Sequence, residues 1–367
     1  MKIICSKSSL LKSVSIALKA VPSKTTMPIL ECILMDATTN QIKFTTNDME
    51  LGIETIVEGT IEEKGRVALD AKIFYEIIRR LPDNDITIKT DEKYTATITC
   101  EKAKFNIPGK SGEDFAYLPM IEKDEPLTIS QYTLKEMIRQ TIFSIAVNEN
   151  NKLMTGELFE IKNNCLKVVS LDGHRIAIRK MPLKREYSDR KVVVPGKTLS
   201  EVSKILSGEV DDQVSIYFTK NHILFEFDNT RVVSRLLEGE YYKISQMLSS
   251  DYETKITINK KEFLNCIDRA SLLIRESDKK PIIIDIADHS LKLNINSFFG
   301  SMEEEILIQK EGRDLLIGFN PKFLMDVLRV IDDEEINIYL VNPKAPCYIK
   351  DDAGTYNYLI LPVNFNH

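Results

Sequence analysis

Residues 319–332 read FNPKFLMDVLRVID, and a stretch of this pattern occurs three times in the chain. The other copies are LDAKIFYEIIRRLP at residues 69–82 and VPGKTLSEVSKILS at residues 194–207, so the copies are spaced by 125 residues. Their apolar positions repeat at helical spacing, which predicts one amphipathic helix in each copy. A period of this length is the size of an independent domain and is too long for a solenoid repeat.

Polar chemistry repeats in the same three helices. One column is always lysine, one is always acidic and one is always basic: Lys72, Lys197 and Lys322; Glu76, Glu201 and Asp326; Arg79, Lys204 and Arg329. At 100° per residue the three columns lie within about 60° of one another, opposite the apolar positions. A lysine and an acid four residues apart predict an ion pair on a solvated helix surface. That pairing leaves the third, basic column unexplained.

Alternating, strand-like stretches flank each helix, and a second helical pattern opens each copy. The six expected helices cover residues 8–20, 71–81, 131–146, 196–207, 260–275 and 321–331. Each copy therefore reads as helix, strands, helix, strands. The predicted fold is α+β, with three tandem domains rich in antiparallel strand at residues 1–124, 125–250 and 251–367.

The composition is that of a soluble globular protein, with 43% hydrophobic and 28% charged residues among 367. No apolar run approaches the roughly 20 residues of a membrane helix, and the N-terminus lacks the pattern of a signal peptide. The six cysteines are scattered without a Cys-x-x-Cys pair, so neither a disulfide framework nor a zinc site is expected. We expect a cytoplasmic protein that needs no metal or cofactor and does not associate with membranes.

The net charge of −6 at first argues against a nucleic-acid partner. However, the six expected helices hold 15 Lys or Arg and 6 Asp or Glu, whereas the remainder holds 34 and 49. Basic helices on an acidic body attract phosphates on one surface and repel them elsewhere. Such contacts carry no base information, so the sequence indicates DNA binding without sequence preference.

A catalytic interpretation has little support. The sequence Asp172-Gly173-His174-Arg175 offers an acid–base pair, but Asp172 is equivalent to Asp48 in the first copy, which favours a turn. Gly109-Lys110-Ser111 and Gly196-Lys197-Thr198 lack the earlier glycine of a phosphate-binding loop. We therefore predict no catalytic residues.

Several strings resemble one family over essentially the whole length of the chain. They are KTTMPIL from Lys24, ELFE from Glu157, LDGHR from Leu171, VPGK from Val194, GFNPKFLMDVL from Gly318 and YLILPV from Tyr358. In this order and spacing they resemble the bacterial sliding clamp, the non-catalytic beta subunit of DNA polymerase III.

The resemblance implies a head-to-tail homodimer, a six-domain ring lined by helices through which double-stranded DNA passes. The basic columns then become the DNA-facing lining. The predicted DNA-binding residues are Lys24, Lys72, Arg79, Lys197, Lys204, Lys322 and Arg329. The dimer interface implied by motif position uses Phe105 against Leu272 and Leu273.

The resemblance also implies a groove for short linear peptides of the DNA polymerase III catalytic subunit, the clamp loader, other polymerases and repair proteins. Its expected residues are Met154, Leu171, Gly173, His174, Arg175, Ile176, Tyr242, Met247, Asn320, Phe323, Leu361, Pro362 and Val363. Three departures from the family pattern concern this groove: Tyr241-Tyr242 replaces an aromatic–proline pair, Gln246 replaces a basic residue, and the chain ends in Val-Asn-Phe-Asn-His.

Two other classes of function remain open at this point. A nuclease would use Asp172 and His174, and would cleave duplex DNA with magnesium. A scaffold that binds only proteins would not be retained on circular DNA after a salt wash.

Overall fold

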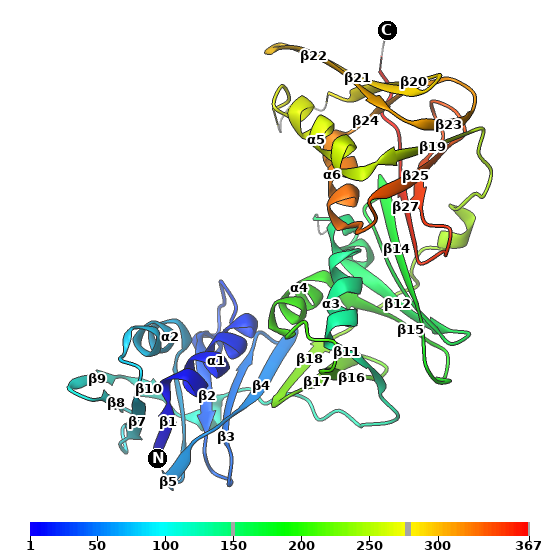
Figure 1. The fold of residues 1–367 in the computed structure, drawn as a ribbon. Coiled ribbons are helices and arrows are strands. Elements are labelled where there is room, and N and C mark those ends of the chain that lie inside the picture. The colour runs from blue at the N-terminus through cyan, green and yellow to red at the C-terminus, as the bar shows by residue number, and fades with distance from the viewer. Residues whose placement is uncertain (148–150, 276–279, 366–367) are drawn as a thin grey trace. The chain divides into compact units, whose positions relative to one another are not determined.

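The computed structural model describes residues 1–147, 151–275 and 280–365. The chain forms two compact units (Figure 1). The first unit combines Met1–Lys135 with Lys197–Leu236, and the second combines Glu136–Gly196 with Leu237–His367. The middle repeat is thus shared between the units.

All six expected helices are present in the described part of the chain. They are α1 (Lys7–Ala17), α2 (Ala71–Arg80), α3 (Gln131–Arg139), α4 (Gly196–Ile205), α5 (Lys260–Ser271) and α6 (Pro321–Val330). Helices α1, α3 and α5 are shorter than predicted. The short 3-10 turns η1 (Leu18–Ala20) and η4 (Ile142–Ser144) take up the ends of the first two periodic stretches, and α5 ends at Ser271. The repeat itself is confirmed, since α2, α4 and α6 have the same length and begin 125 residues apart.

The helix starts follow from local chemistry. The Asp70 side chain accepts a hydrogen bond from the Ile73 N–H at 2.8 Å and caps α2. The Asn320 side chain caps α6 through the Lys322 N–H at 3.0 Å, and Pro321 occupies the first turn, where a missing N–H costs nothing. These caps fix the residues at which α2 and α6 begin.

The first unit contains two antiparallel sheets. A five-stranded sheet has the order β5-β1-β7-β8-β9, and a nine-stranded sheet has the order β10-β6-β2-β3-β4-β18-β17-β16-β11. The strands are β1 (Lys2–Ser6), β2 (Cys32–Asp36), β3 (Ile42–Asn47), β4 (Leu51–Val57), β5 (Thr60–Glu63), β6 (Arg66–Asp70), β7 (Asp85–Thr90), β8 (Ala96–Cys100), β9 (Ala103–Ile107), β10 (Gly109–Lys110), β11 (Leu127–Ser130), β16 (Gln213–Phe218), β17 (His222–Phe227) and β18 (Thr230–Arg235).

The second unit repeats this organisation. Its nine-stranded sheet has the order β15-β12-β13-β14-β27-β26-β25-β19-β23, and a four-stranded sheet has the order β22-β21-β20-β24. The strands are β12 (Gly156–Lys162), β13 (Cys165–Leu171), β14 (Arg175–Pro182), β15 (Arg190–Pro195), β19 (Thr254–Asn259), β20 (Ile282–Ala287), β21 (Ser290–Ser297), β22 (Gly300–Leu307), β23 (Gln309–Gly312), β24 (Leu315–Phe319), β25 (Glu335–Leu340), β26 (Cys347–Lys350) and β27 (Tyr356–Ile360).

Each nine-stranded sheet joins two consecutive repeats. In the first unit the joint is the pair β4–β18, with Thr55 opposite Thr230. In the second unit it is the pair β14–β27, with Arg179 opposite Tyr356. Because backbone hydrogen bonds run across these joints, the borders between repeats lie inside continuous sheets.

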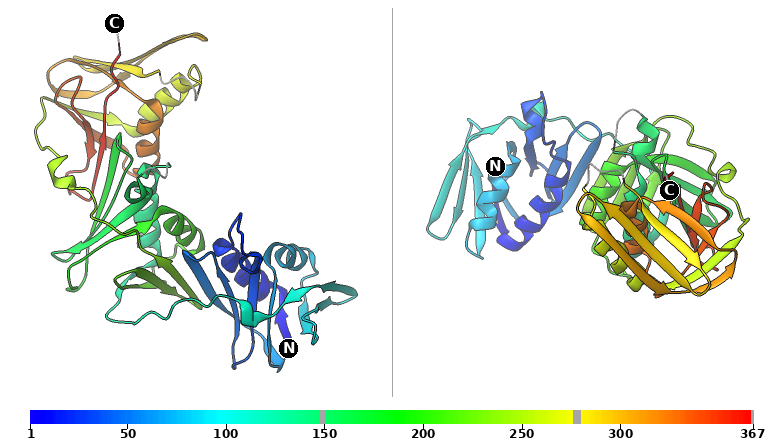
Figure 2. Two further views of the ribbon diagram at one scale, coloured as in Figure 1. Left: turned by 180° about the vertical axis from the view of Figure 1, so that it is seen from behind. Right: turned by 90° about the horizontal axis from the view of Figure 1, so that it is seen from above.

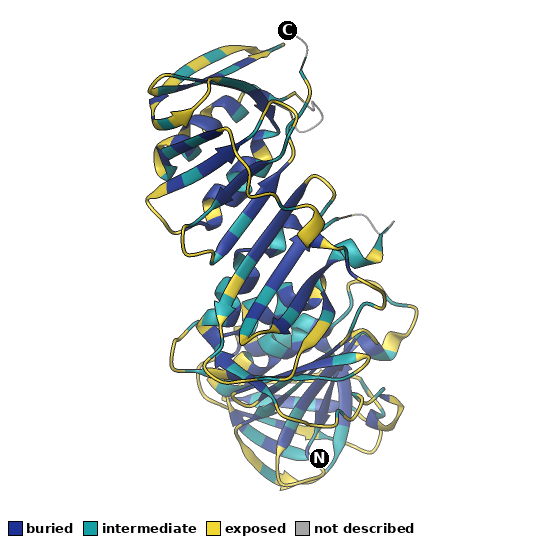
Figure 3. Cartoon of the chain, turned by 90° about the vertical axis from the view of Figure 1, so that its right-hand side faces the viewer, coloured by how far each residue is buried: buried dark blue, intermediate teal, exposed yellow. Residues whose placement is uncertain are grey.

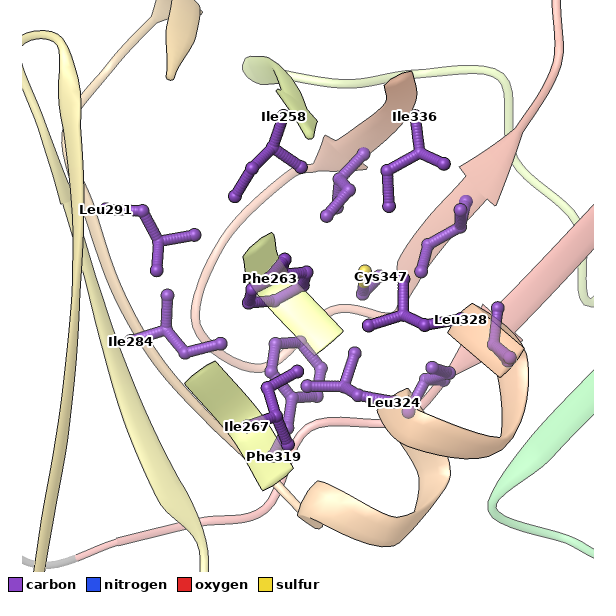
Figure 4. Packing of buried hydrophobic residues seen from close by; sticks show 14 of the residues in the cluster. Ile258, Phe263, Ile267, Ile284, Leu291, Phe319, Leu324, Leu328, Ile336 and Cys347 are labelled. Carbon is purple, nitrogen blue, oxygen red and sulfur yellow. The ribbon is translucent and has the colours of Figure 1, made fainter. Parts of the chain in front are cut away.

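The helices of a unit lie together on one side of its strands. Helices α1 and α2 contact each other in the first unit, and α5 and α6 do so in the second (Figures 1 and 2). Buried residues alternate with less buried ones along most strands, whereas the connecting turns are largely exposed (Figure 3). In the second unit, Phe263, Leu324 and Leu328 of the two helices meet Ile284 and Leu291 of the sheet in one core (Figure 4). This burial holds the opposite, polar helix faces towards solvent.

Among the described residues, no helix has the length and apolar character to cross a bilayer.

Candidate nucleic-acid interface and peptide groove

On α2 the two predicted DNA-binding residues, Lys72 and Arg79, are exposed, and Phe74 lies buried on the other side of the helix. Glu76 pairs with Arg79 at 2.8 Å and with Arg80 at 3.0 Å. Its hydrogen bond raises the pKa of Arg79. The predicted i, i+4 pair between Lys72 and Glu76 was therefore wrong. The Glu76 carboxylate turns towards the last turn of the helix, where the helix dipole also favours cations.

Helix α4 presents Lys197 and Lys204 in the same way, with side chains 62% and 55% exposed. Glu201 again pairs three residues onward, with Lys204 at 2.8 Å. Lys197 forms an ion pair with Asp48, in the turn between β3 and β4. Both amines remain at the surface, although their carboxylate partners Asp48 and Glu201 are only 5% and 20% exposed.

Helix α6 departs from this pattern. Lys322 is exposed, and Arg329 is 56% exposed at 3.6 Å from Asp268 on α5. The carboxylate of the column, Asp326, instead binds Arg175 at 2.6 Å. Arg329 therefore has no carboxylate of its own helix beside it.

Lys24 is exposed in the segment between η1 and η2 (Pro28–Glu31), outside the helices. Like the helix cations it carries a positive charge, but within the described part of the chain no contact joins it to them. Exposed amines and guanidinium groups on the outer side of packed helices suit reversible phosphate contacts.

The turn from Asp172 to Arg175 confirms the structural interpretation of that motif. The Asp172 carboxylate accepts the backbone N–H groups of His174 at 2.9 Å and of Arg175 at 3.1 Å, and Gly173 has φ +89°. Asp48 makes the same turn in the first repeat, accepting the N–H groups of Glu50 and Leu51. The aspartate is therefore occupied in shaping the backbone.

Arg175 is buried, with only 7% of the side chain exposed. Its guanidinium binds Asp172 at 3.0 Å, Asp326 at 2.6 Å and the Phe143 carbonyl at 2.6 Å, and lies over the Phe323 ring at 4.5 Å. Two carboxylates and a carbonyl satisfy a buried cation that would otherwise be costly. The predicted groove residues did not include Asp172, Asp326 and Phe143, which hold Arg175 in place. The acidic column contained Asp326, but its periodicity indicated only a surface position.

His174, Phe323 and Leu361 come together next to this arginine. The exposed His174 ring stacks on Phe323 at 5.9 Å, and the His174 carbonyl accepts the Leu361 N–H at 2.9 Å. Leu361 is 37% exposed. An apolar and aromatic surface beside a fixed cation is suited to anchoring side chains of a peptide.

Other predicted groove residues join one adjacent apolar cluster. Leu171 and Ile176 are buried in it, and Met154 and Tyr242 pack against it. Met247 is 43% exposed, and its carbonyl accepts the hydroxyl of Tyr348, a member of the cluster, at 3.2 Å.

The remaining predicted groove residues lie outside this apolar cluster. Asn320 caps α6, Pro362 follows β27, and the Val363 N–H donates to the Gly318 carbonyl at 2.8 Å. The tail after β27 is thus tied to the edge of β24.

The residues expected at a dimer interface differ in exposure. Phe105 on β9 is 40% exposed and borders a depression along α2 that Ile73 and Ile77 also line. Leu272, just after α5, is 81% exposed, and Leu273 packs partly against the core of its unit.

The sequence of the chain matches three known domain families. Residues 1–119, 128–243 and 245–364 match the N-terminal, central and C-terminal domains of the DNA polymerase III beta subunit. Three tandem clamp domains of mixed helix and antiparallel sheet thus define a sliding-clamp type of protein, which is a non-catalytic class.

The beta sliding clamp of Staphylococcus aureus is 34% identical over 359 residues, covering 94% of both chains. A crystal structure of a putative DNA polymerase III beta subunit from Eubacterium rectale is 67% identical with a TM-score of 0.97, and the Bacillus subtilis DNA polymerase sliding clamp is 35% identical with a TM-score of 0.96, each covering 100% of both chains. The chain belongs to the family of beta sliding clamps, the beta subunits of DNA polymerase III.

Proposed function

We propose that two copies of this chain close head to tail into a ring around duplex DNA, which tethers the replicative polymerase without sequence preference. The observation that carries this proposal is the number of strands in each sheet. Both nine-stranded sheets join a half from one repeat to a half from the next, whereas the five-stranded and four-stranded sheets are unjoined. Together these two halves supply the nine strands of a third joined sheet.

The internal joints predict how these halves pair. Strand β9 is one edge of the five-stranded sheet, and β22 is one edge of the four-stranded sheet; β5 and β24 are the other edges. In the repeat, β4, β14 and β22 are equivalent, as are β18, β27 and β9. Unpaired edges invite pairing with another chain, and β9 of one copy thus pairs with β22 of the other.

The register follows from the same equivalence. The internal joints place Thr55 opposite Thr230 and Arg179 opposite Tyr356. The equivalent pair across the proposed joint is Glu304 of one copy opposite Ala103 of the other. One residue along, Glu303 of one copy faces Lys104 of the other, and Phe105 faces Met302. Opposite charges directly across an antiparallel pair are favourable. Phe105 then lies in the seam, with Leu272 and Leu273 as its apolar complement.

The native mass tests the ring. We expect about twice the mass of the 42.0-kDa chain. Lys104→Glu and Glu303→Lys each weaken the dimer, and the double charge swap restores it, as measured by light scattering during size exclusion. A wild-type monomer overturns the ring; failure of the swap with a dimeric wild type overturns the register.

The DNA-facing lining consists of the seven basic residues predicted from the repeat and the Lys24 motif: Lys24, Lys72, Arg79, Lys197, Lys204, Lys322 and Arg329. Their exposure on packed helices supports the assignment. Phosphate contacts of this kind exchange readily, which is what sliding along a duplex requires.

The surface around His174, Phe323, Leu361 and Met247 accepts short peptides of the polymerase, the clamp loader and repair proteins. The preformed Arg175 network supports it, because a fixed pocket spares the ordering cost of binding. In this proposal the three domains occupy residues 1–124, 125–250 and 251–367, and the ring works in the cytoplasm, where the chromosome lies.

A further inference from the structure

The hairpin between β21 and β22 ends in two neighbouring phenylalanines at the surface. Phe298 is 93% exposed and Phe299 is 46% exposed, and their rings meet edge to face at 5.7 Å. The Arg275 guanidinium lies over the Phe299 ring at 4.5 Å and holds it in place. Apolar side chains gathered in the open mark a surface that another molecule covers.

The turn that carries this pair is the third copy of a turn found at both internal joints. The Ser297 hydroxyl accepts the Phe299 N–H at 3.0 Å. In the first two copies Asp48 and Asp172 likewise accept the N–H two residues onward, at 3.0 and 2.9 Å. The three hairpin tips are therefore equivalent residue by residue.

At both internal joints this turn makes a hydrogen bond to the strand across the joint. The Arg235 N–H donates to the Glu50 carbonyl and the Leu361 N–H to the His174 carbonyl, each at 2.9 Å. Side chains meet at the same point in the first joint, where Glu50 and Arg235 lie 3.7 Å apart. Glu50 and His174 hold the position of Phe299, so this position contacts the strand across the joint.

The register proposed for β9 and β22 places Phe299 of one copy opposite Pro108 of the other. Pro108 corresponds to Arg235 and Leu361, the donors of the two internal joints. Because proline has no N–H, it cannot donate the hydrogen bond made there. Contact between the two rings is what this position can offer instead.

The end of β9 presents an apolar surface for such a contact. Pro108 is exposed, and Tyr94, in the turn between β7 and β8, is 40% exposed. The Tyr94 carbonyl lies so close to Gly109 that a methyl group on Gly109 would meet it at 2.5 Å. Pro108 and the turn of Tyr94 therefore adjoin.

The surroundings of the phenylalanine pair favour a second copy of the chain as its partner. Strand β22 begins at Gly300, directly after the pair, so the proposed joint runs into the tip without a gap. Arg275, which holds Phe299, follows Leu272 and Leu273 by a few residues, and these leucines belong to the same proposed seam. The tip is thus continuous with the surface proposed to join two copies.

We propose that the Phe298–Phe299 tip of one copy docks on the end of β9 of the other and forms an aromatic clasp at the rim of the seam. This inference rests on the proposed head-to-tail ring. Phe299 packs on the Pro108 ring, and Phe298 packs beside Tyr94. Since Arg275 already orders Phe299, docking costs little conformational entropy.

Cross-linking tests the contact directly. The full-length protein carrying Phe299→Cys and Pro108→Cys is oxidised mildly and run on a non-reducing gel. We expect a covalent species of twice the chain mass, because residues directly opposite in an antiparallel pair lie within disulfide reach. Phe299→Cys with Lys102→Cys is the matched control and stays unlinked, since Lys102 lies exposed at the other end of β9. Each single variant measures the background from the native cysteines.

The affinity of the dimer provides the second measurement, by sedimentation of fluorescently labelled protein. Phe298→Ser raises the dissociation constant about tenfold, because a buried aromatic contact is lost. Met49→Ser, at the equivalent and 52% exposed tip of the first hairpin, leaves the constant unchanged. A monomeric wild type overturns the ring and the clasp with it. With a dimeric wild type, the clasp alone is overturned if the cysteine pair stays unlinked or if Phe298→Ser keeps the wild-type constant.

Discussion

Asp326 on α6 lies 2.6 Å from Arg175, which is 151 positions earlier in the chain. Its equivalents Glu76 and Glu201 pair instead with cations of their own helices, at 2.8 Å in each case. The acidic column of the repeat thus pairs with cations of its own helix in two copies and with Arg175 of the proposed peptide groove in the third. The same helix carries Phe323, which Arg175 covers.

Asp326→Asn leaves the buried Arg175 with one carboxylate fewer. We expect a loss of about 3 kcal/mol in the free energy of unfolding, because an uncompensated buried cation is costly. Affinity for a polymerase-derived peptide falls as well, since Arg175 and the Phe323 ring lose their fixed geometry. Chemical denaturation and peptide titration measure the two effects.

Glu201→Gln is the matched control for that change. It removes the equivalent carboxylate from α4, whose partner Lys204 is 55% exposed, so the cost is expected to stay below about 1 kcal/mol. Equal destabilisation by the two variants would contradict the special role of Asp326.

Lys204→Glu combined with Arg329→Glu reverses two charges of the proposed lining. Retention on circular duplex DNA is expected to fall about tenfold or more, with a shallower salt dependence, because fewer counterions are released. Both side chains are more than half exposed, so the melting temperature is expected to change little. Lys180→Glu with Lys220→Glu carries the same charge change at other exposed positions and should be retained better. Unchanged retention of the first variant would reduce the basic columns to a solvated surface.

Met247→Glu places a charge on the apolar groove. Polymerase stimulation is expected to be lost while the native mass stays that of a dimer, because Met247 is already 43% exposed and its backbone contact to Tyr348 persists. Met120→Glu, at an exposed methionine of the first unit, should leave stimulation intact. A monomeric Met247→Glu protein would show that the groove is misplaced.

Glu157 on β12 is fully buried, and neither carboxylate oxygen has a hydrogen-bond partner among the described residues. Burial raises the pKa of this carboxyl well above its usual value, although Thr141 opposes the shift. The Thr141 hydroxyl already donates to the Met137 carbonyl at 2.7 Å, which limits its help. The folded protein therefore keeps a proton that the unfolded chain releases.

The sign of the pH effect follows. Above the unfolded pKa, near 4.3, the folded state binds more protons, so stability falls as pH rises towards the raised pKa, by at most about 1.4 kcal/mol per pH unit. Glu157→Gln removes this component and should flatten the dependence of the unfolding midpoint on pH. Glu160→Gln, on the same strand but paired with Lys167, is the matched substitution for comparison.

The helices were predictable because their cause is local. Apolar spacing and the capping residues Asp70 and Asn320 lie within a few positions of each helix start. The sheet joints were not predictable, because the pairs β4–β18 and β14–β27 connect strands far apart in sequence. The alternation of apolar and polar residues in these strands is the same as in any half-buried strand. Pattern alone thus predicts three domains but not how they share sheets.

The candidate site also has a part that the sequence predicts and a part that it does not. The basic columns could be read from periodicity, whereas the partners of Asp326 and Lys197 depend on turns brought close by the fold. The groove residues came from resemblance. Glu157 is an exception to the rule that unpaired carboxylates avoid the interior. Its residue type therefore predicts exposure, and its burial could not be foreseen.

The two edge strands proposed to meet, β9 and β22, differ in charge. Lys104 belongs to β9, whereas β22 carries Glu303, Glu304 and Glu305. Two β22 edges would bring acidic side chains together, whereas the unlike pairing sets Lys104 against Glu303. An unlike contact has direction, and copies that add in one direction either close or grow without limit into a filament. In the proposed ring, closing after two copies therefore also protects the chain against polymerisation.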